Sequence, residues 1–183
     1  MTSRTVLWRR LDTTGLELFR LRQQASGWEL GGTVIVVNDG TRCGFVYEVR
    51  CDESWRARAA RVSGHIGDQA LEVLVETDGE GRWWRNGEEQ PAVAGCIDVD
   101  IAFTPATNTI PIRRLRLPVG ASAPVSAAWL RFPDLSLALL EQSYRREGEH
   151  TYRYESGGGS FVAMLEVDDD GLVRQYGEYW RAE

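Results

Sequence analysis

Hydrophobic and polar residues alternate along most of this chain with a period close to two. Residues 45–51 carry an aromatic or apolar side chain at every second position, and residues 71–76, 97–103 and 161–167 also keep apolar side chains on one face. Alternation of this kind is typical of β-strands with one buried face. The pattern therefore predicts a chain that is rich in strands.

Glycine-containing turns separate these runs and suit β-hairpins. Residues 156–160, Ser-Gly-Gly-Gly-Ser, are interpreted as a flexible hairpin loop. Residues 34–37 are apolar at every position, which predicts a strand covered on both faces, unless Val36 or Val37 faces a cavity. His65 lies in Ser-Gly-His-Ile-Gly-Asp, which we expect to form a loop. The other turn signals lie at residues 38–40, 78–81, 86–87 and 169–171.

Evidence for helices is confined to two segments. Pro111 and the spacing of the apolar residues after it predict one helical turn at residues 109–116, with Thr109 as its cap. Residues 134–147 fit both periods: the leucines at every second position favour a strand, and a helix is the alternative. Taken together, the pattern predicts an all-β protein with about ten or more short strands in one antiparallel sheet system. Closure, curling or sandwiching must then protect the edges of that sheet.

Composition excludes several classes of function. The chain has 183 residues, which suits a single domain over residues 1–183, and its formal net charge is −6. An acidic protein is a poor match for a nucleic-acid backbone or an anionic membrane surface. All 21 basic residues are arginine, so catalysis through a lysine Schiff base and a P-loop lysine are both excluded.

Cysteine and histidine give no metal or redox motif. The three cysteines are widely spaced without a Cys-x-x-Cys pair, and two histidines cannot make a three-histidine site. We therefore expect no metal and no cofactor. The first residues contain no apolar segment typical of a signal peptide, and the longest apolar runs are too short to span a bilayer. This predicts a cytoplasmic protein with reduced thiols and no transmembrane segment.

Two acids and a group of arginines lie close together in the sequence. Asp98 and Asp100 are two residues apart on a predicted strand, so both side chains leave the same face about 6.5 Å apart. Carboxylates that flank a scissile glycosidic bond approach it from opposite sides, which this arrangement does not provide. The acids are expected to be solvated or paired with Arg113 or Arg114, and any remaining hydrogen-bonding capacity would serve a polyol ligand.

The other candidate ligand-binding residues are polar or aromatic. Asn108 lies between two threonines and is expected to bond nearby backbone, with ligand contact as the alternative. Trp83 and Trp84 are adjacent on a predicted strand, so one ring should face inward and the other outward, where it can stack on a sugar or an acyl chain. Tyr152, at a predicted strand start, completes the set.

Residues 95–115, G-C-I-D-V-D-I-A-F-T-P-A-T-N-T-I-P-I-R-R-L, resemble the bacterial glycolipid-binding family, which was once a domain of unknown function. Further segments agree in order over nearly the whole chain, at residues 47–55, 78–87, 142–144, 152–156 and 167–176. The resemblance implies a spiral β-roll or half-barrel with at most one or two short helices. This implied fold is similar to that of lipoprotein carriers, whose concave side holds acyl chains. Such carriers work outside the cytoplasm.

Three functions remain open at this stage. The first is non-catalytic binding of a small amphiphile, a glycolipid or fatty-acyl compound, on the concave side of the curled sheet. The second is a hydrolase acting on a sugar or lipid ester through Asp98 or Asp100. The third is a protein-interaction module that uses the aromatic surplus. The resemblance favours binding, with the acids and arginines near the polar mouth of an apolar cavity.

Overall fold

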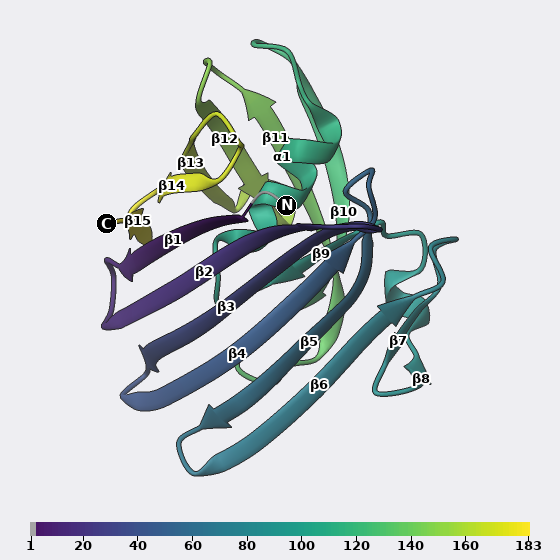
Figure 1. Ribbon diagram of the computed structural model, residues 1–183, viewed down its shortest axis with the longest axis vertical. Helices are drawn as coiled ribbons and strands as arrows, with labels where there is room; N and C mark the ends of the chain where they lie inside the picture. The colour runs from purple at the N-terminus through teal and green to yellow at the C-terminus, as the bar shows by residue number, and fades with distance from the viewer. Residues whose placement is uncertain (1–2) are drawn as a thin grey trace.

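The computed structural model of the protein describes residues 3–183, which form one curled, open sheet of 15 strands (Figure 1). Neighbouring strands are antiparallel, apart from one parallel pair, and long alternating runs account for most of them. The predicted all-β class with a curled antiparallel sheet is confirmed. The first eight strands are β1 (Ser3–Arg10), β2 (Gly15–Gln24), β3 (Gly27–Asn38), β4 (Thr41–Cys51), β5 (Ala57–Ile66), β6 (Gln69–Thr77), β7 (Trp83–Arg85) and β8 (Glu88–Glu89).

The second half of the chain continues the same sheet and contributes the only α-helix of the described residues. The strands are β9 (Asp98–Ile101), β10 (Ser122–Leu130), β11 (Leu137–Arg146), β12 (Thr151–Ser156), β13 (Phe161–Val167), β14 (Val173–Tyr176) and β15 (Trp180–Ala182). The helix is α1 (Thr109–Leu115), and three short 3-10 turns are η1 (Pro91–Val93), η2 (Ala106–Asn108) and η3 (Gly157–Gly159).

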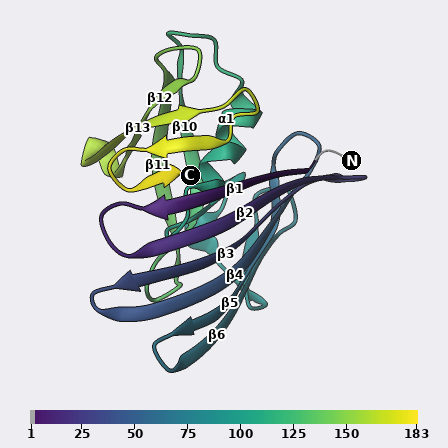
Figure 2. The ribbon, with the colours of Figure 1, turned by 60° about the vertical axis from the view of Figure 1, so that its left-hand side comes forward.

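The two ends of the chain meet inside the sheet. The strand order runs from β8 back to β1, then β15, and from there back to β9, so β1 pairs with β15. Every other adjacent pair in the sheet is also adjacent in sequence. Figures 1 and 2 show β1–β6 as one curved tier and β10–β14 as a second, with α1 between them.

The local predictions concern residues 134–147, the loop at residues 156–160 and the helix. The strand interpretation of residues 134–147 is confirmed by β11, and the hairpin loop at residues 156–160 is confirmed by η3 between β12 and β13. The single helix is also where we expected it. However, Thr109 is its first helical residue and not its cap. The cap position belongs to Asn108, and the Thr109 hydroxyl is buried without a hydrogen-bond partner.

Two further expectations were wrong. His65 lies within β5, because Gly64 permits a close approach of β4 and does not mark a turn: a Cβ at Gly64 would lie 1.9 Å from the carbonyl oxygen of Gly44. Residues 34–37 are not covered on both faces either. Val34 is fully buried, whereas Ile35 is 66% exposed on the outer face of β3. The alternative agrees with the structure, because Val36 and Val37 border a hollow of about 360 Å³.

The hollow of the first tier is filled by the chain itself. Aromatic and aliphatic side chains from the inner face of β1–β6 form one continuous core with the segment from η1 to α1. Phe103 stacks on Phe45 with ring centroids 4.5 Å apart, and Trp8 donates its indole N–H to the carbonyl oxygen of Val173 at 2.8 Å. Side chains of the protein itself therefore occupy the inner face of β1–β6.

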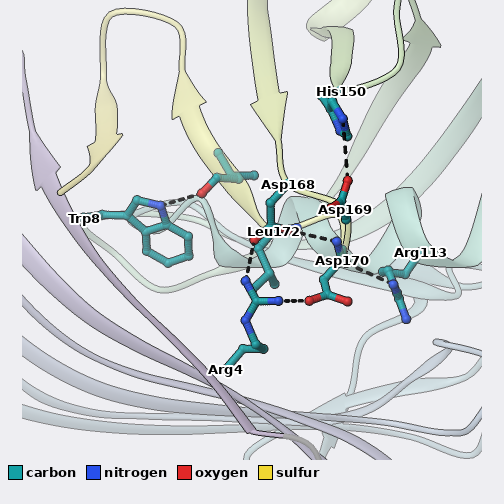
Figure 3. A network of polar contacts seen from close by, with 9 residues as sticks. Arg4, Trp8, Arg113, His150, Asp168, Asp169, Asp170 and Leu172 are labelled. Carbon is teal, nitrogen blue, oxygen red and sulfur yellow. Dashed lines mark hydrogen bonds and ion pairs between the residues drawn. The ribbon is translucent and has the colours of Figure 1, made fainter.

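A polar network fastens the β13–β14 turn to the first tier (Figure 3). Nη2 of Arg4 donates to Oδ2 of Asp168 at 2.9 Å, and the same guanidinium contacts Asp170. Arg113, from α1, donates to the carbonyl oxygen of Asp170 at 3.1 Å. His150 approaches Asp169, with Nε2 3.6 Å from Oδ1. The contacts of Arg4 and Arg113 hold the second tier against β1 and α1.

Candidate functional site

The two aspartates of β9 share one face, as predicted, but only one of them is paired with a cation. Arg114, in the last turn of α1, donates from Nε to Oδ1 of Asp98 at 3.0 Å and from Nη2 to Oδ2. This two-point contact satisfies an almost completely buried carboxylate. Burial raises the pKa of Asp98, and the Arg114 guanidinium acts in the opposite direction. Asp98 is therefore a structural ion-pair partner.

Asp100 has a different environment. Its Oδ2 accepts a hydrogen bond from Nε2 of Gln142 on β11, at 2.6 Å. Burial raises the pKa of Asp100 to about 6; the Gln142 hydrogen bond lowers it, and the nearby charge of Asp98 raises it further. No hydrogen bond to Oδ1 of Asp100 is found among residues 3–183. Asp100 can therefore still accept a hydrogen bond from a ligand.

A cavity of about 410 Å³ lies in front of Asp100, within the size range of small-molecule sites. Asn108 borders it as well, so the structure brings together two of the predicted site residues. Further polar and aromatic side chains around it come from β10, β12, β13 and β14. They are Trp129, Tyr154, Ser156, Phe161 and Tyr176.

Strand register assembles this lining from distant parts of the sequence. The parallel pairing of β9 and β10 places Trp129 opposite Asp100. The β12–β13 hairpin sets Phe161 opposite Ser156, and the β13–β14 pairing sets Tyr176 opposite Leu165. Side chains at alternate positions share a face, so these residues all project to the inner side of the second tier.

Three of the rings form an aromatic wall, defined here as Tyr154, Phe161 and Tyr176. Their centroids are 6.0–6.3 Å apart, and each pair of ring planes meets at 61–71°. This edge-to-face packing fixes the rings relative to one another. A rigid aromatic surface next to a carboxylate suits a ligand that has both apolar faces and hydrogen-bond donors, as sugars do.

Asn108 contributes to the site mainly through hydrogen bonds to other parts of the protein. Its Oδ1 accepts a hydrogen bond from the Tyr144 hydroxyl at 2.8 Å, and its Nδ2 donates to the carbonyl oxygen of Pro105 at 3.2 Å. The residue is buried at the end of η2, where the chain turns into α1. The expected bond to nearby backbone is therefore present, and only its edge borders the cavity.

Arg113 and Tyr152 lie in a second hollow, of about 310 Å³. The Arg113 guanidinium lies over the stacked indoles of Trp55 and Trp28, 5.2 Å and 5.6 Å from their ring centroids. Burial lowers the pKa of Arg113. Arg146 lies over the ring of Tyr152 at 5.7 Å. The candidates Arg113 and Tyr152 thus lie apart from the Asp100 cavity.

Trp83 and Trp84 divide as expected into an inward and a more exposed ring. Trp83 is buried, and its indole N–H donates to the carbonyl oxygen of Cys96 at 2.9 Å. Trp84 is half-buried beneath the guanidinium of Arg82, 5.2 Å from its ring centroid. Neither indole lines the Asp100 cavity.

A buried acid behind the cavity was not anticipated from the sequence. Glu17 on β2 is completely buried, and its Oε1 accepts hydrogen bonds from the hydroxyls of Tyr47 at 2.5 Å and Thr104 at 2.7 Å. Thr104 in turn lines the cavity. Burial raises the pKa of Glu17 to about 8, and its Oε2 has no partner. In the sequence, burial of Glu17 was indicated only by its position two residues before Phe19, on the same face of the strand.

The described residues contain no cluster of three or more histidine, cysteine, aspartate or glutamate side chains that could hold a metal ion. Within the same part of the chain, no helix has the length and apolar character needed to cross a bilayer.

Comparison with known proteins agrees with the resemblance in the sequence. A family model described as "Putative glycolipid-binding" matches residues 5–182. The crystal structure of a DUF1089 family protein from Pseudomonas aeruginosa is similar, with a TM-score of 0.79 and 33% sequence identity over 88% of each chain. Among curated proteins no match is found. With nearly its whole length matched by the family model, the chain belongs to the glycolipid-binding family, formerly DUF1089.

Proposed function

We propose that this protein binds a sugar-bearing amphiphile without transforming it, with the head group in the cavity beside Asp100. The observation that carries the proposal is the combination of a carboxylate with an unoccupied acceptor oxygen and a rigid aromatic wall at one cavity. Sugar hydroxyls donate well to carboxylates, and the apolar faces of sugars stack on aromatic rings. The family description supports the same class of ligand.

The apolar part of the ligand would leave the cavity along Trp129, Leu140 and Phe161, which also line it. Each buried methylene would contribute about 0.8 kcal/mol. The hollow of the first tier is filled by Phe103 and its neighbours, so the tail would follow the second tier. The proposal therefore puts binding on the concave side of the second half of the sheet.

A hydrolase is the less well supported alternative. A pKa of about 6 would suit Asp100 as a proton donor or acceptor. However, glycosidases of the common kind need two carboxyl groups around the scissile bond. Asp98 is occupied by Arg114, and no histidine or second acid borders the cavity among residues 3–183. The arrangement therefore favours binding over catalysis.

Titration of octyl β-D-glucoside, followed by calorimetry, tests the proposal with two matched variants. Trp129 and Trp84 are both half-buried indoles beneath an arginine, but only Trp129 lines the cavity. We expect Trp129→Leu to weaken binding about tenfold, since a well-placed aromatic contact contributes ~1.4 kcal/mol. Trp84→Leu should leave binding within about twofold of the wild type, less than 0.5 kcal/mol.

Native mass spectrometry of the protein purified from bacteria provides an independent measurement. The expected result is an added mass that organic extraction removes and identifies as an amphiphile. A wild-type protein that carries no such mass and gives no binding heat with the glucoside contradicts the proposal, as does an equal loss of affinity in the two tryptophan variants.

A further inference from the structure

The carboxylate of Asp100 has no cationic partner, although the chain contains 21 arginines. Its neighbour Asp98 is neutralised by Arg114, but the group that donates to Asp100 is the uncharged amide of Gln142. Arg131 lies over the ring of Trp129 at 5.7 Å and does not line the cavity. When Asp100 is ionised, the cavity therefore holds a negative charge that the described residues leave uncompensated.

The rest of the cavity wall has the same electrostatic preference. Ring faces carry negative potential and attract cations placed within about 6 Å. The cavity is bordered by the aromatic wall and by Trp129, and the described residues add no arginine or histidine to its lining. Burial raises the pKa of both Tyr154 and Tyr176, so their hydroxyls stay neutral and present oxygen acceptors. The Asp100 carboxylate and the ring faces thus favour a cation, and the remaining polar groups of the lining are uncharged.

We propose that the head group bound beside Asp100 carries a positive charge, as in an amino sugar or another ammonium compound. The ammonium would donate to the unoccupied Oδ1 of Asp100 and lie against the aromatic wall. This inference rests on the proposed function, because it concerns the ligand of the same cavity. It specifies a chemical class that is narrower than glycolipids as a whole.

Alternative head groups fit the cavity less well. A phosphate, sulfate or carboxylate would face Asp100 at short range and without a cation between them, which is repulsive. A neutral sugar would leave the charge of Asp100 partly buried and unpaired, or would require Asp100 to bind a proton. Burial raises the pKa of Asp100 to about 6, so at neutral pH an ammonium meets a carboxylate that is mostly ionised.

The test compares three amphiphiles with the same octyl tail. They are octyl β-D-glucoside, octyl 2-amino-2-deoxy-β-D-glucoside and the N-acetylated form of the amino compound. Calorimetric titration of the wild-type protein at neutral pH should give an affinity for the amino compound at least about tenfold higher than for the other two, equal to ~1.4 kcal/mol. N-acetylation removes the charge and keeps the sugar ring, so it isolates the contribution of the ammonium.

Asp100→Asn should abolish this difference, because asparagine removes the charge; the affinity for the glucoside, whose hydroxyls lose one carboxylate acceptor, should fall less than the affinity for the amino compound. The matched control is Glu141→Gln, which removes an exposed carboxylate on the outer face of the same strand as Gln142. This control should preserve the preference for the amino compound. The comparison of the three ligands in the wild-type protein does not depend on either variant.

The possible results distinguish failure of this inference from failure of the proposed function. Equal binding of all three compounds overturns the cationic head group and leaves the proposed function standing. An equal loss of affinity for glucoside and amino compound in Asp100→Asn also overturns it, because charge is then not the basis of the preference. Failure of all three compounds to bind the wild type removes the proposed function and this inference together.

Discussion

Asp98 and Asp100 project from the same face of β9, yet Asp98 is held by a guanidinium and Asp100 by a neutral amide. The two carboxylates therefore have different roles despite their adjacency. Asp98 joins β9 to α1, while Asp100 faces the cavity. The aspartate pair and the arginine cluster in the sequence thus form one structural ion pair and leave Asp100 without a cationic partner.

Removal of the Asp98 partner should strongly destabilise the protein. Arg114→Ala leaves a buried carboxylate without a cation, which typically costs about 3–5 kcal/mol. Urea unfolding at neutral pH measures the change. The control is Arg145→Ala on β11, because Arg145 pairs with Glu147 at 3.3 Å at an exposed position and its loss should cost less than about 0.5 kcal/mol. Equal effects of the two substitutions would contradict a structural role for the Asp98–Arg114 pair.

Glu17 should make the free energy of unfolding depend on pH. Its pKa is about 8 in the folded protein, above its ordinary value, so between these values the folded state binds more protons than the unfolded state. The stability from this group is therefore fully present below pH ~4.5 and is lost as the pH rises through about 8.

Glu17→Gln mimics the protonated acid and should remove this decline, which makes the variant more stable than the wild type in mildly alkaline solution. Thermal unfolding at several pH values between 5 and ~9 measures both profiles. Glu141→Gln, at an exposed site on β11, is expected to retain the wild-type profile. A wild type without any decline over this range would show that Glu17 is ionised in the folded state.

Gly32 provides the space for the Tyr47 ring. A Cβ at this position would lie 2.5 Å from Cε1 and 2.7 Å from the hydroxyl oxygen of Tyr47. Gly32→Ala must displace the ring and its hydrogen bond to Glu17, at a cost of about 1–3 kcal/mol. Gly31→Ala is the matched control, since its Cβ would meet only the backbone oxygen of Tyr47 at an ordinary 3.5 Å. Chemical unfolding of both variants should separate them clearly.

Arg113 should stabilise the contact between the two tiers through the indoles beneath it. Arg113→Met keeps much of the side-chain volume and removes the cation from Trp55 and Trp28, which should cost about 1–2 kcal/mol and alter tryptophan fluorescence. The comparison is Arg131→Met, whose guanidinium lies over the half-buried Trp129. A change of less than about 0.5 kcal/mol is expected there. If the order of the two effects is reversed, Arg113 does not fasten the tiers.

The strand content was predictable because period-two alternation is a local property, and residues 134–147 became β11 for that reason. Which face of each strand is buried was harder to predict from the sequence. Ile35 and Val34 look alike in sequence, but only the curl of the sheet decides that Ile35 faces outward. The structural role of glycine was also ambiguous. Gly64 allows the close contact with β4, whereas the turn follows at residues 67–68.

The candidate site was only partly predictable, since its members meet through strand register. Asp100 and Asn108 belong to one recognisable segment and were found. Tyr176 reaches Tyr154 only after β12, β13 and β14 have paired in register, and that register is set by turn geometry. Tyr152 was named as a candidate at a predicted strand start, but it borders the second hollow, and Tyr154 borders the Asp100 cavity.

The pairing of β1 with β15 has a consequence for how the protein is made. Trp8 lies opposite Ala182, so the seam between the two tiers joins residues almost a full chain length apart. This pairing cannot form until β15 has been synthesised, so one edge of β1 stays unpaired until then. A short peptide that links β15 to β1, with new ends opened in the exposed turn at residues 118–121, would place the seam within a local hairpin and should accelerate folding.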